Sequence, residues 1–191
     1  MKNIFINAVE IAKGICKTKL SDGDTAVDCT MGNGNDTVFL CGLVGEKGKV
    51  YAFDIQEEAV ISTHKRLGDV NFLQRSELIL DGHENVDKYI KESVKLVIFN
   101  LGYLPKGDHT ITTKKETTIE AVQKCLCLLE PNGIILLVIY PGHEKGRLEK
   151  EALETFTSSL NQKEYNVVKL CFTNQINNPP ELICIEKVNQ K

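Results

Sequence analysis

The chain has 191 residues, of which 42% are hydrophobic and 26% are charged, and its formal net charge is −3. This length predicts one domain, residues 1–191, with a sizeable core, and the composition is ordinary for a soluble globular protein. The acidic balance excludes a broadly basic nucleic-acid-binding face, though not a local one, and no apolar run approaches the ~20 residues of a membrane span.

The first half of the chain alternates helical and strand patterns. Apolar residues at helical spacing predict an amphipathic helix over residues 3–17, which we expect to cover one edge of a sheet. A short apolar strand at 25–29 leads through a glycine turn into a helix that begins at Thr37. The next predicted elements are a strand at 49–54, a helix at 56–67, a strand at 70–74 and a helix at 84–91.

The second half continues the alternation of helices and strands and then ends in two consecutive strand patterns. The predicted elements are a strand at 94–100, a helix at 117–129, a strand at 134–140 after the turn Pro131–Gly133, and a helix at 143–160. Residues 165–173 and 181–188 alternate as a closing antiparallel pair would. This order predicts an α/β, Rossmann-like fold: a mostly parallel sheet of seven strands with helices on both faces.

Seven cysteines, an odd number, are scattered through apolar segments. This usage favours reduced core thiols in a cytoplasm over a disulfide framework, and the N-terminus lacks a signal-peptide layout. Cys125-Leu-Cys127 does not have the spacing of a zinc pair, so we expect no metal site.

The glycine turn carries the first chemical signal. A strand, a glycine turn and a helix aim backbone N–H groups at a bound cofactor. Nicotinamide enzymes use Gly-x-Gly-x-x-Gly, but here the third glycine position is Thr37, and Asp28 before the turn would repel a pyrophosphate. The pattern Asp-x-Thr-x-Gly-x-Gly-x-Asp, residues 28–36, resembles the first motif of class I SAM-dependent methyltransferases. A carboxylate before the turn suits the cationic groups of S-adenosyl-L-methionine (SAM). The cofactor-binding residues predicted here are Asp28, Thr30, Gly32, Asn33, Gly34, Asn35 and Asp36. A glycine loop that only turns the chain is the alternative.

Two later strand ends complete the predicted cofactor site. Asp54 lies about 20 residues beyond the glycines, where a carboxylate accepts hydrogen bonds from ribose hydroxyls. Ile55 and Gln56 follow it, and Gly82 and His83 fall where related folds hold the adenine edge. For Gln56 the alternative is a polar residue at a helix start, and for Gly82 and His83 it is a helix-capping turn.

The stretch Asn100-Leu-Gly-Tyr-Leu-Pro105 resembles the Asn/Asp-Pro-Pro-Tyr/Phe motif of amino-group methyltransferases. In that motif the amide and a loop carbonyl accept hydrogen bonds from the target amine, and the aromatic residue packs on the base. The resemblance implies that Asn100 and Tyr103 are catalytic and that Leu101 and Gly102, which replace the two prolines, contact the substrate. Asn100 is also predicted to bind the cofactor. Alternatively, Asn100 caps the strand and Tyr103 packs on a helix.

Two further segments are substrate-binding candidates. In the polar stretch after Pro105, Lys106 and His109, together with Lys114 and Lys115, are placed to contact phosphates, although a plain solvated loop would look the same. At the end of the fifth strand, Tyr140 offers a stacking surface, and His143 is a third catalytic candidate, which positions or deprotonates the substrate. An exposed histidine at a helix start is the alternative.

These motifs together resemble a small bacterial family labelled putative rRNA methylases, which is associated with tRNA 5-(aminomethyl)-2-thiouridine methyltransferase activity. The resemblance implies SAM-dependent N-methylation of the 5-aminomethyl group of wobble 2-thiouridine, with the anticodon stem-loop of tRNA as partner. A homodimer is expected, because one small domain presents little surface to that stem-loop. The alternatives are an rRNA target, a small-molecule methyltransferase, and a nucleotide-binding module without catalysis.

Overall fold

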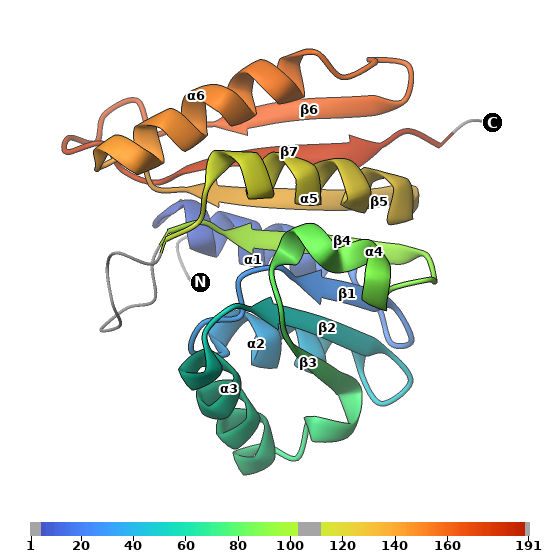
Figure 1. Cartoon of the computed structure of the whole chain (residues 1–191). Helices are drawn as coiled ribbons and strands as arrows, with labels where there is room; N and C mark the ends of the chain where they lie inside the picture. Colours follow the sequence, from blue (N-terminus) through green and yellow to red (C-terminus); the bar gives the residue numbers. More distant parts are fainter. Residues whose placement is uncertain (1–4, 103–111, 190–191) are drawn as a thin grey trace.

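In this computed structural model, residues 5–102 and 112–189 are described, and their strands form one seven-stranded sheet in the order β3-β2-β1-β4-β5-β7-β6 (Figure 1). Strands β1 to β5 pair in parallel, and β7 pairs antiparallel with both β5 and β6. The bounds are β1 Thr25–Asp28, β2 Lys49–Asp54, β3 Ser76–Leu80, β4 Val94–Asn100, β5 Leu129–Ile139, β6 Tyr165–Leu170 and β7 Glu181–Lys187. This arrangement confirms the predicted fold class.

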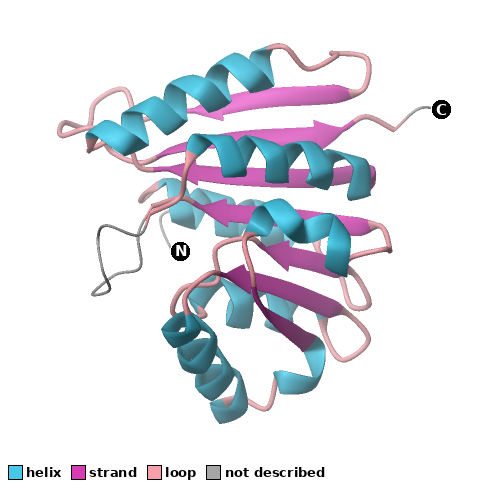
Figure 2. Cartoon of the chain, viewed as in Figure 1, coloured by secondary structure: helices cyan, strands magenta, loops and turns pink. Residues whose placement is uncertain are grey.

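Helices cover both faces of the sheet (Figures 1 and 2). One hydrophobic cluster joins the sheet to α1, α2 and α3, and a second joins the opposite face to α4, α5 and α6. The bounds are α1 Ala8–Lys19, α2 Asn35–Val44, α3 Glu57–Asp69, α4 Val86–Tyr89, α5 Lys115–Leu128 and α6 Glu144–Ser158, with 3-10 turns η1 Leu73–Arg75 and η2 His83–Asn85. Because both faces are covered, the central strands are continuous apolar runs.

Three sequence predictions about elements need correction. The strand expected at 70–74 is instead the end of a turn and η1, and β3 begins at Ser76. The first helix does not cover a sheet edge, because α1 packs against β4, β5 and β7. The turn predicted at Pro131–Gly133 lies within the bounds of β5, where Asn132 adopts a φ of 61° and the pairing with β4 shifts register.

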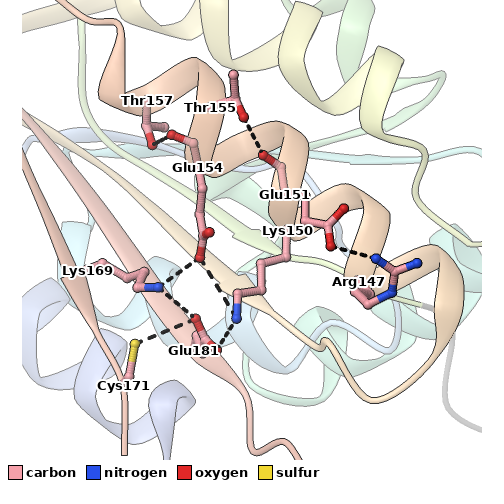
Figure 3. A network of polar contacts seen from close by, with 9 residues as sticks. All are labelled: Arg147, Lys150, Glu151, Glu154, Thr155, Thr157, Lys169, Cys171 and Glu181. Atoms are coloured by element: carbon pink, nitrogen blue, oxygen red, sulfur yellow. Dashed lines mark hydrogen bonds and ion pairs between the residues drawn. The ribbon is translucent and has the colours of Figure 1, made fainter.

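A polar network attaches α6 to the closing antiparallel pair (Figure 3). Lys150 of α6 lies 2.5 Å from Glu181 of β7, and Lys169 of β6 lies 2.8 Å from Glu154 of α6. Lys169 also lies 3.5 Å from Glu181, so the carboxylate of Glu181 forms ion pairs with both Lys150 and Lys169. The outer strands are thereby held to the helix that follows β5. Across the described part of the chain, no helix is long and apolar enough to cross a bilayer.

Candidate cofactor and amine site

The glycine turn between β1 and α2 depends on two left-handed glycines. Gly32 has a φ of 50° and Gly34 a φ of 78°, a region that glycine enters without steric cost. A Cβ atom on Gly34 would lie 2.7 Å from Oγ1 of Thr63 in α3, so the turn also needs glycine for space. Thr63 Oγ1 donates a hydrogen bond to the carbonyl of Gly32 over 3.1 Å. Helix α3 thus holds the turn in place.

Asp54, at the end of β2, holds the same turn from the other side. Its Oδ2 accepts the N–H of Gly32 over 2.9 Å, and its Oδ1 accepts the N–H of Gln56 over 3.0 Å. An ionised carboxylate has about four acceptor positions, so two remain for ribose hydroxyls. The next side chain, Ile55, is 62% exposed and offers an apolar surface at this strand end.

Asp28, at the end of β1, is a fully enclosed carboxylate. Its side chain accepts the hydroxyl of Thr37 over 2.7 Å and the N–H of Thr30 over 3.1 Å. Burial, and then the negative charge of Asp36, raise the pKa of Asp28 from 3.8 to about 7. The two hydrogen bonds act in the opposite direction without cancelling that rise.

The donors and charges of this turn fit a cationic cofactor better than a pyrophosphate. The N–H of Gly32 is committed to Asp54, and the N–H of Gly34 donates to the carbonyl of Met31 over 2.8 Å. A pyrophosphate would need such N–H groups to be free. The negative charges of Asp36 and Asp54 beside the turn would repel a pyrophosphate and suit the ammonium and sulfonium groups that SAM carries. The residues present therefore fit SAM.

Asn100 ends β4 beside this turn, and its side chain is oriented by a carboxylate. Nδ2 of Asn100 donates to Oδ2 of Asp36 over 3.1 Å, and the backbone N–H of Asn100 donates to Oγ1 of Thr30 over 2.7 Å. A carboxylate only accepts, so the amide nitrogen must face Asp36 and Oδ1 must face away. None of the described residues donates to that oxygen, which leaves it as an acceptor for a ligand.

Asp36 is itself held by a residue that the sequence did not single out. Its Oδ1 lies 3.8 Å from Nζ of Lys13 in α1, and its side chain is nearly buried. Burial, and then the charge of Asp36, raise the pKa of the Tyr140 hydroxyl. The sequence did not indicate a role for Lys13, because this residue lies on the polar face of an ordinary amphipathic helix.

The residues after Asn100 are anchored at the base of their loop. The N–H of Leu101 donates to the carbonyl of Val138 in β5 over 2.9 Å. Gly102 has a φ of 145°, and its carbonyl accepts the N–H of Thr113 over 3.1 Å. A Cβ atom on Gly102 would come within 4.0 Å of the Tyr140 ring, so this segment lies against Tyr140. The predicted residues Tyr103, Lys106 and His109 lie outside the described residues.

His143 occupies the N-cap position of α6, and this position limits what the ring can do. Its Nδ1 accepts the N–H of Gly146 over 3.0 Å. In a neutral imidazole the proton must then be on Nε2, so the ring presents a donor there, not a base. Accepting a proton at Nδ1 would break the cap. The geometry therefore favours positioning over deprotonation for His143.

His83 is buried beneath the strand ends. Its Nδ1 lies 2.9 Å from the carbonyl oxygen of Cys29, which requires the proton on Nδ1. Its ring packs edge-on against the ring of Phe99, with 5.5 Å between the ring centroids. Burial lowers the pKa of His83, so the ring is neutral near pH 7. Its Nε2 has no hydrogen-bond partner among the described residues. Gly82 precedes it as the N-cap of η2, and adenine contact by either residue stays a prediction.

Predicted site residues at the ends of β1, β2 and β4 thus meet in one place. Hydrogen bonds connect Asp28 to Thr30, Thr30 to Asn100, and Asn100 to Asp36, while a separate bond connects Asp54 to Gly32. These residues follow β1, β2 and β4, whose carboxyl ends lie at one edge of the sheet, as parallel pairing requires. This edge is the left-hand side of the sheet in Figure 1.

The chain is similar to proteins named as methyltransferases. The family described as "Putative rRNA methylase" matches residues 50–186. A protein of Arabidopsis thaliana named "tRNA (mnm(5)s(2)U34)-methyltransferase, chloroplastic" is 37% identical over 178 residues, which make up 88% of this chain. The match spans 65% of the length of that relative, just under two thirds.

Two solved structures are similar over nearly their whole length. The crystal structure of a putative rRNA-methylase from Clostridium thermocellum is 50% identical with a TM-score of 0.94, covering 95% of this chain and 98% of that one. The crystal structure of a putative methyltransferase from Streptococcus mutans in complex with SAH is 39% identical with a TM-score of 0.88. That likeness covers 98% of this chain and 99% of the other.

Proposed function

The chain belongs to the family described as putative rRNA methylases, which has the fold and the cofactor of SAM-dependent methyltransferases, and we propose that it N-methylates the 5-aminomethyl group of wobble 2-thiouridine in tRNA. The name of the Arabidopsis thaliana relative supports this choice of substrate over rRNA. The observation that carries the proposal is the oriented amide of Asn100, whose oxygen is turned away from Asp36 and is open to a donor.

An amine substrate needs acceptors that leave its lone pair free. SAM, when bound, supplies an electrophilic methyl group on a sulfonium. An alkyl amine is mostly protonated near neutral pH, so it must lose a proton before its nitrogen can attack. Asn100 Oδ1 is too weak a base for that step, but it can accept an N–H and so hold the nitrogen in line. Asp36 prevents the amide from turning its nitrogen toward the amine, where it would compete as a donor.

The remaining parts of the proposal concern the partner. We place the anticodon stem-loop of tRNA against the sheet edge that carries Asn100 and Tyr140, with Tyr140 as the stacking surface. Lys106, Lys114 and Lys115 are the proposed phosphate contacts, since a net acidic chain has to use a few local cations. A single domain, a homodimer and a cytoplasmic location stay predictions.

The test is methyl transfer from SAM into tRNA that lacks only the terminal methyl group, followed by mass spectrometry of the nucleosides. Asn100→Ala should slow the single-turnover rate by about tenfold to a thousandfold and leave SAM affinity nearly unchanged. A parent protein that methylates rRNA fragments or free nucleosides but not this tRNA would contradict the proposed substrate.

A matched exchange of groups tests the orientation of the amide. Asn100→Asp alone places two carboxylates against each other at the 3.1 Å contact with Asp36. Combining Asn100→Asp with Asp36→Asn restores one donor and one acceptor at that contact. The double variant should therefore turn over faster than Asn100→Asp alone. If the double variant is the slower of the two, Asp36 does not act by orienting residue 100.

A further inference from the structure

A buried carboxylate on α6 lies at the base of the loop that follows β4. Glu149 is only 4% exposed, and two hydroxyls donate to it. Thr113 Oγ1 donates to Oε2 over 2.9 Å, and Thr118 Oγ1 donates to Oε1 over 2.7 Å. No motif marks Glu149, because on α6 it is one of many charged residues of a helical pattern.

Thr113 links this carboxylate to the backbone after Asn100. Its hydroxyl has one proton, which goes to Glu149, and its oxygen accepts the N–H of Gly102 over 3.2 Å. The backbone of Thr113 also donates to the carbonyl of Gly102. A chain of two hydrogen bonds therefore runs from Glu149 through Thr113 to the peptide unit between Leu101 and Gly102.

The orientation of that peptide unit decides where a carbonyl points. The bond is trans, so its C=O is directed opposite to its N–H. With the N–H of Gly102 fixed on Thr113, the carbonyl of Leu101 points away from Thr113. The described residues offer no donor to that carbonyl oxygen. It follows Asn100 directly in the chain, so the strand end carries two adjacent acceptors to which none of the described residues donates.

A neutral primary amine has two N–H groups and one lone pair. Aiming the lone pair at a methyl group requires that both N–H groups be held, and Asn100 Oδ1 can hold one of them. We propose that Glu149 and Thr113 are positioning residues, which fix the Leu101–Gly102 peptide unit so that the Leu101 carbonyl holds the second N–H. This inference rests on the proposed amine substrate for its catalytic consequence, whereas the fixed peptide unit does not depend on the substrate.

Thr113→Val removes the link while keeping the shape of the side chain, and Thr113→Ser keeps the hydroxyl. Thr118→Val is the matched control, because it also removes one hydroxyl donor from Glu149 but has no contact with Gly102. We expect Thr113→Val to lower the single-turnover rate by about tenfold or more, with the dissociation constant for SAM unchanged. Thr113→Ser and Thr118→Val should stay within about threefold of the parent.

Amide hydrogen exchange at Gly102 gives a readout that needs no substrate. Protection of this amide should fall in Thr113→Val and persist in Thr113→Ser and Thr118→Val. Unchanged protection in Thr113→Val, or equal loss of rate in Thr113→Val and Thr118→Val, would overturn the inference. If the exchange pattern is as expected but the parent does not methylate the tRNA, the proposed substrate fails and the fixed peptide unit stands.

Discussion

The buried carboxylate of Asp28 should make the stability of the protein depend on pH in an unusual direction. Most native carboxylates have a lowered pKa, but burial and the nearby charge of Asp36 raise the pKa of Asp28 to about 7. The native state then keeps a proton that the unfolded chain, with a pKa near 3.8, releases. Stability from this group is therefore present at low pH and is lost as pH rises from the unfolded value through about 7.

Asp28→Asn removes the titration while keeping the hydrogen bonds. The amide oxygen accepts the N–H of Thr30, and the hydroxyl of Thr37 rotates to accept from the amide nitrogen. Between pH 5 and pH 8, pKa values of 3.8 and about 7 correspond to a loss of about 2–3 kcal/mol in the parent. The variant lacks this loss, because its side chain does not ionise.

The measurement is urea unfolding of the parent and of Asp28→Asn at pH 5 and pH 8, without SAM. All other titrating groups are common to both proteins, so the difference in unfolding free energy between them reports the titration of Asp28 together with its interaction with Asp36. The unfolding free energy of the variant minus that of the parent should increase by about 2–3 kcal/mol from pH 5 to pH 8. A difference that stays constant, or that moves in favour of the parent, would refute the reasoning.

Two further predictions concern the cofactor turn. Asp54→Ala should weaken SAM binding by about 2–3 kcal/mol in calorimetry, because two ribose hydroxyls would lose their acceptor; undiminished affinity would place the adenosine elsewhere. Gly34→Ala should lower the unfolding free energy by about 1–3 kcal/mol, because of its positive φ and the 2.7 Å approach to Thr63. The control is Gly42→Ala in α2, whose Cβ would lie at an ordinary 3.7 Å from the ring of Phe72, and this variant should be neutral or slightly stabilising. Equal losses of stability in both variants would contradict the prediction.

The sequence predicted those parts of the fold that have a strong local pattern. β1, β2 and β4 are buried apolar runs that end in a polar residue, so their ends could be located closely. β3 lies at the sheet edge and buries Ile79 alone of its residues, so its pattern is weak. The apolar residues at 70–74 gave a stronger pattern, although Phe72 there packs beside the Arg75 guanidinium, 4.3 Å from the ring centroid.

The candidate site was predictable as a set of positions but not as a set of contacts. Strand-end residues could be identified from the order of the elements, because parallel strands bring their carboxyl ends together. The contact between Asp36 and Asn100 joins residues far apart in the chain, and no local pattern encodes it. Glu149 was missed for the same reason: a buried carboxylate on an amphipathic helix looks like a surface residue until the loop that packs against it is known.

The insertion of β7 between β5 and β6 has a consequence for synthesis on the ribosome. β5 contains the apolar run Ile134–Ile139, and its second neighbour is supplied by residues 181–187, well after β5 itself has emerged. Until then, one side of β5 presents unpaired backbone groups flanked by aliphatic side chains, a template for wrong pairing with another nascent chain. Completion of the sheet therefore waits for a late segment, so we expect a chain stalled between β5 and β7 to depend on a chaperone.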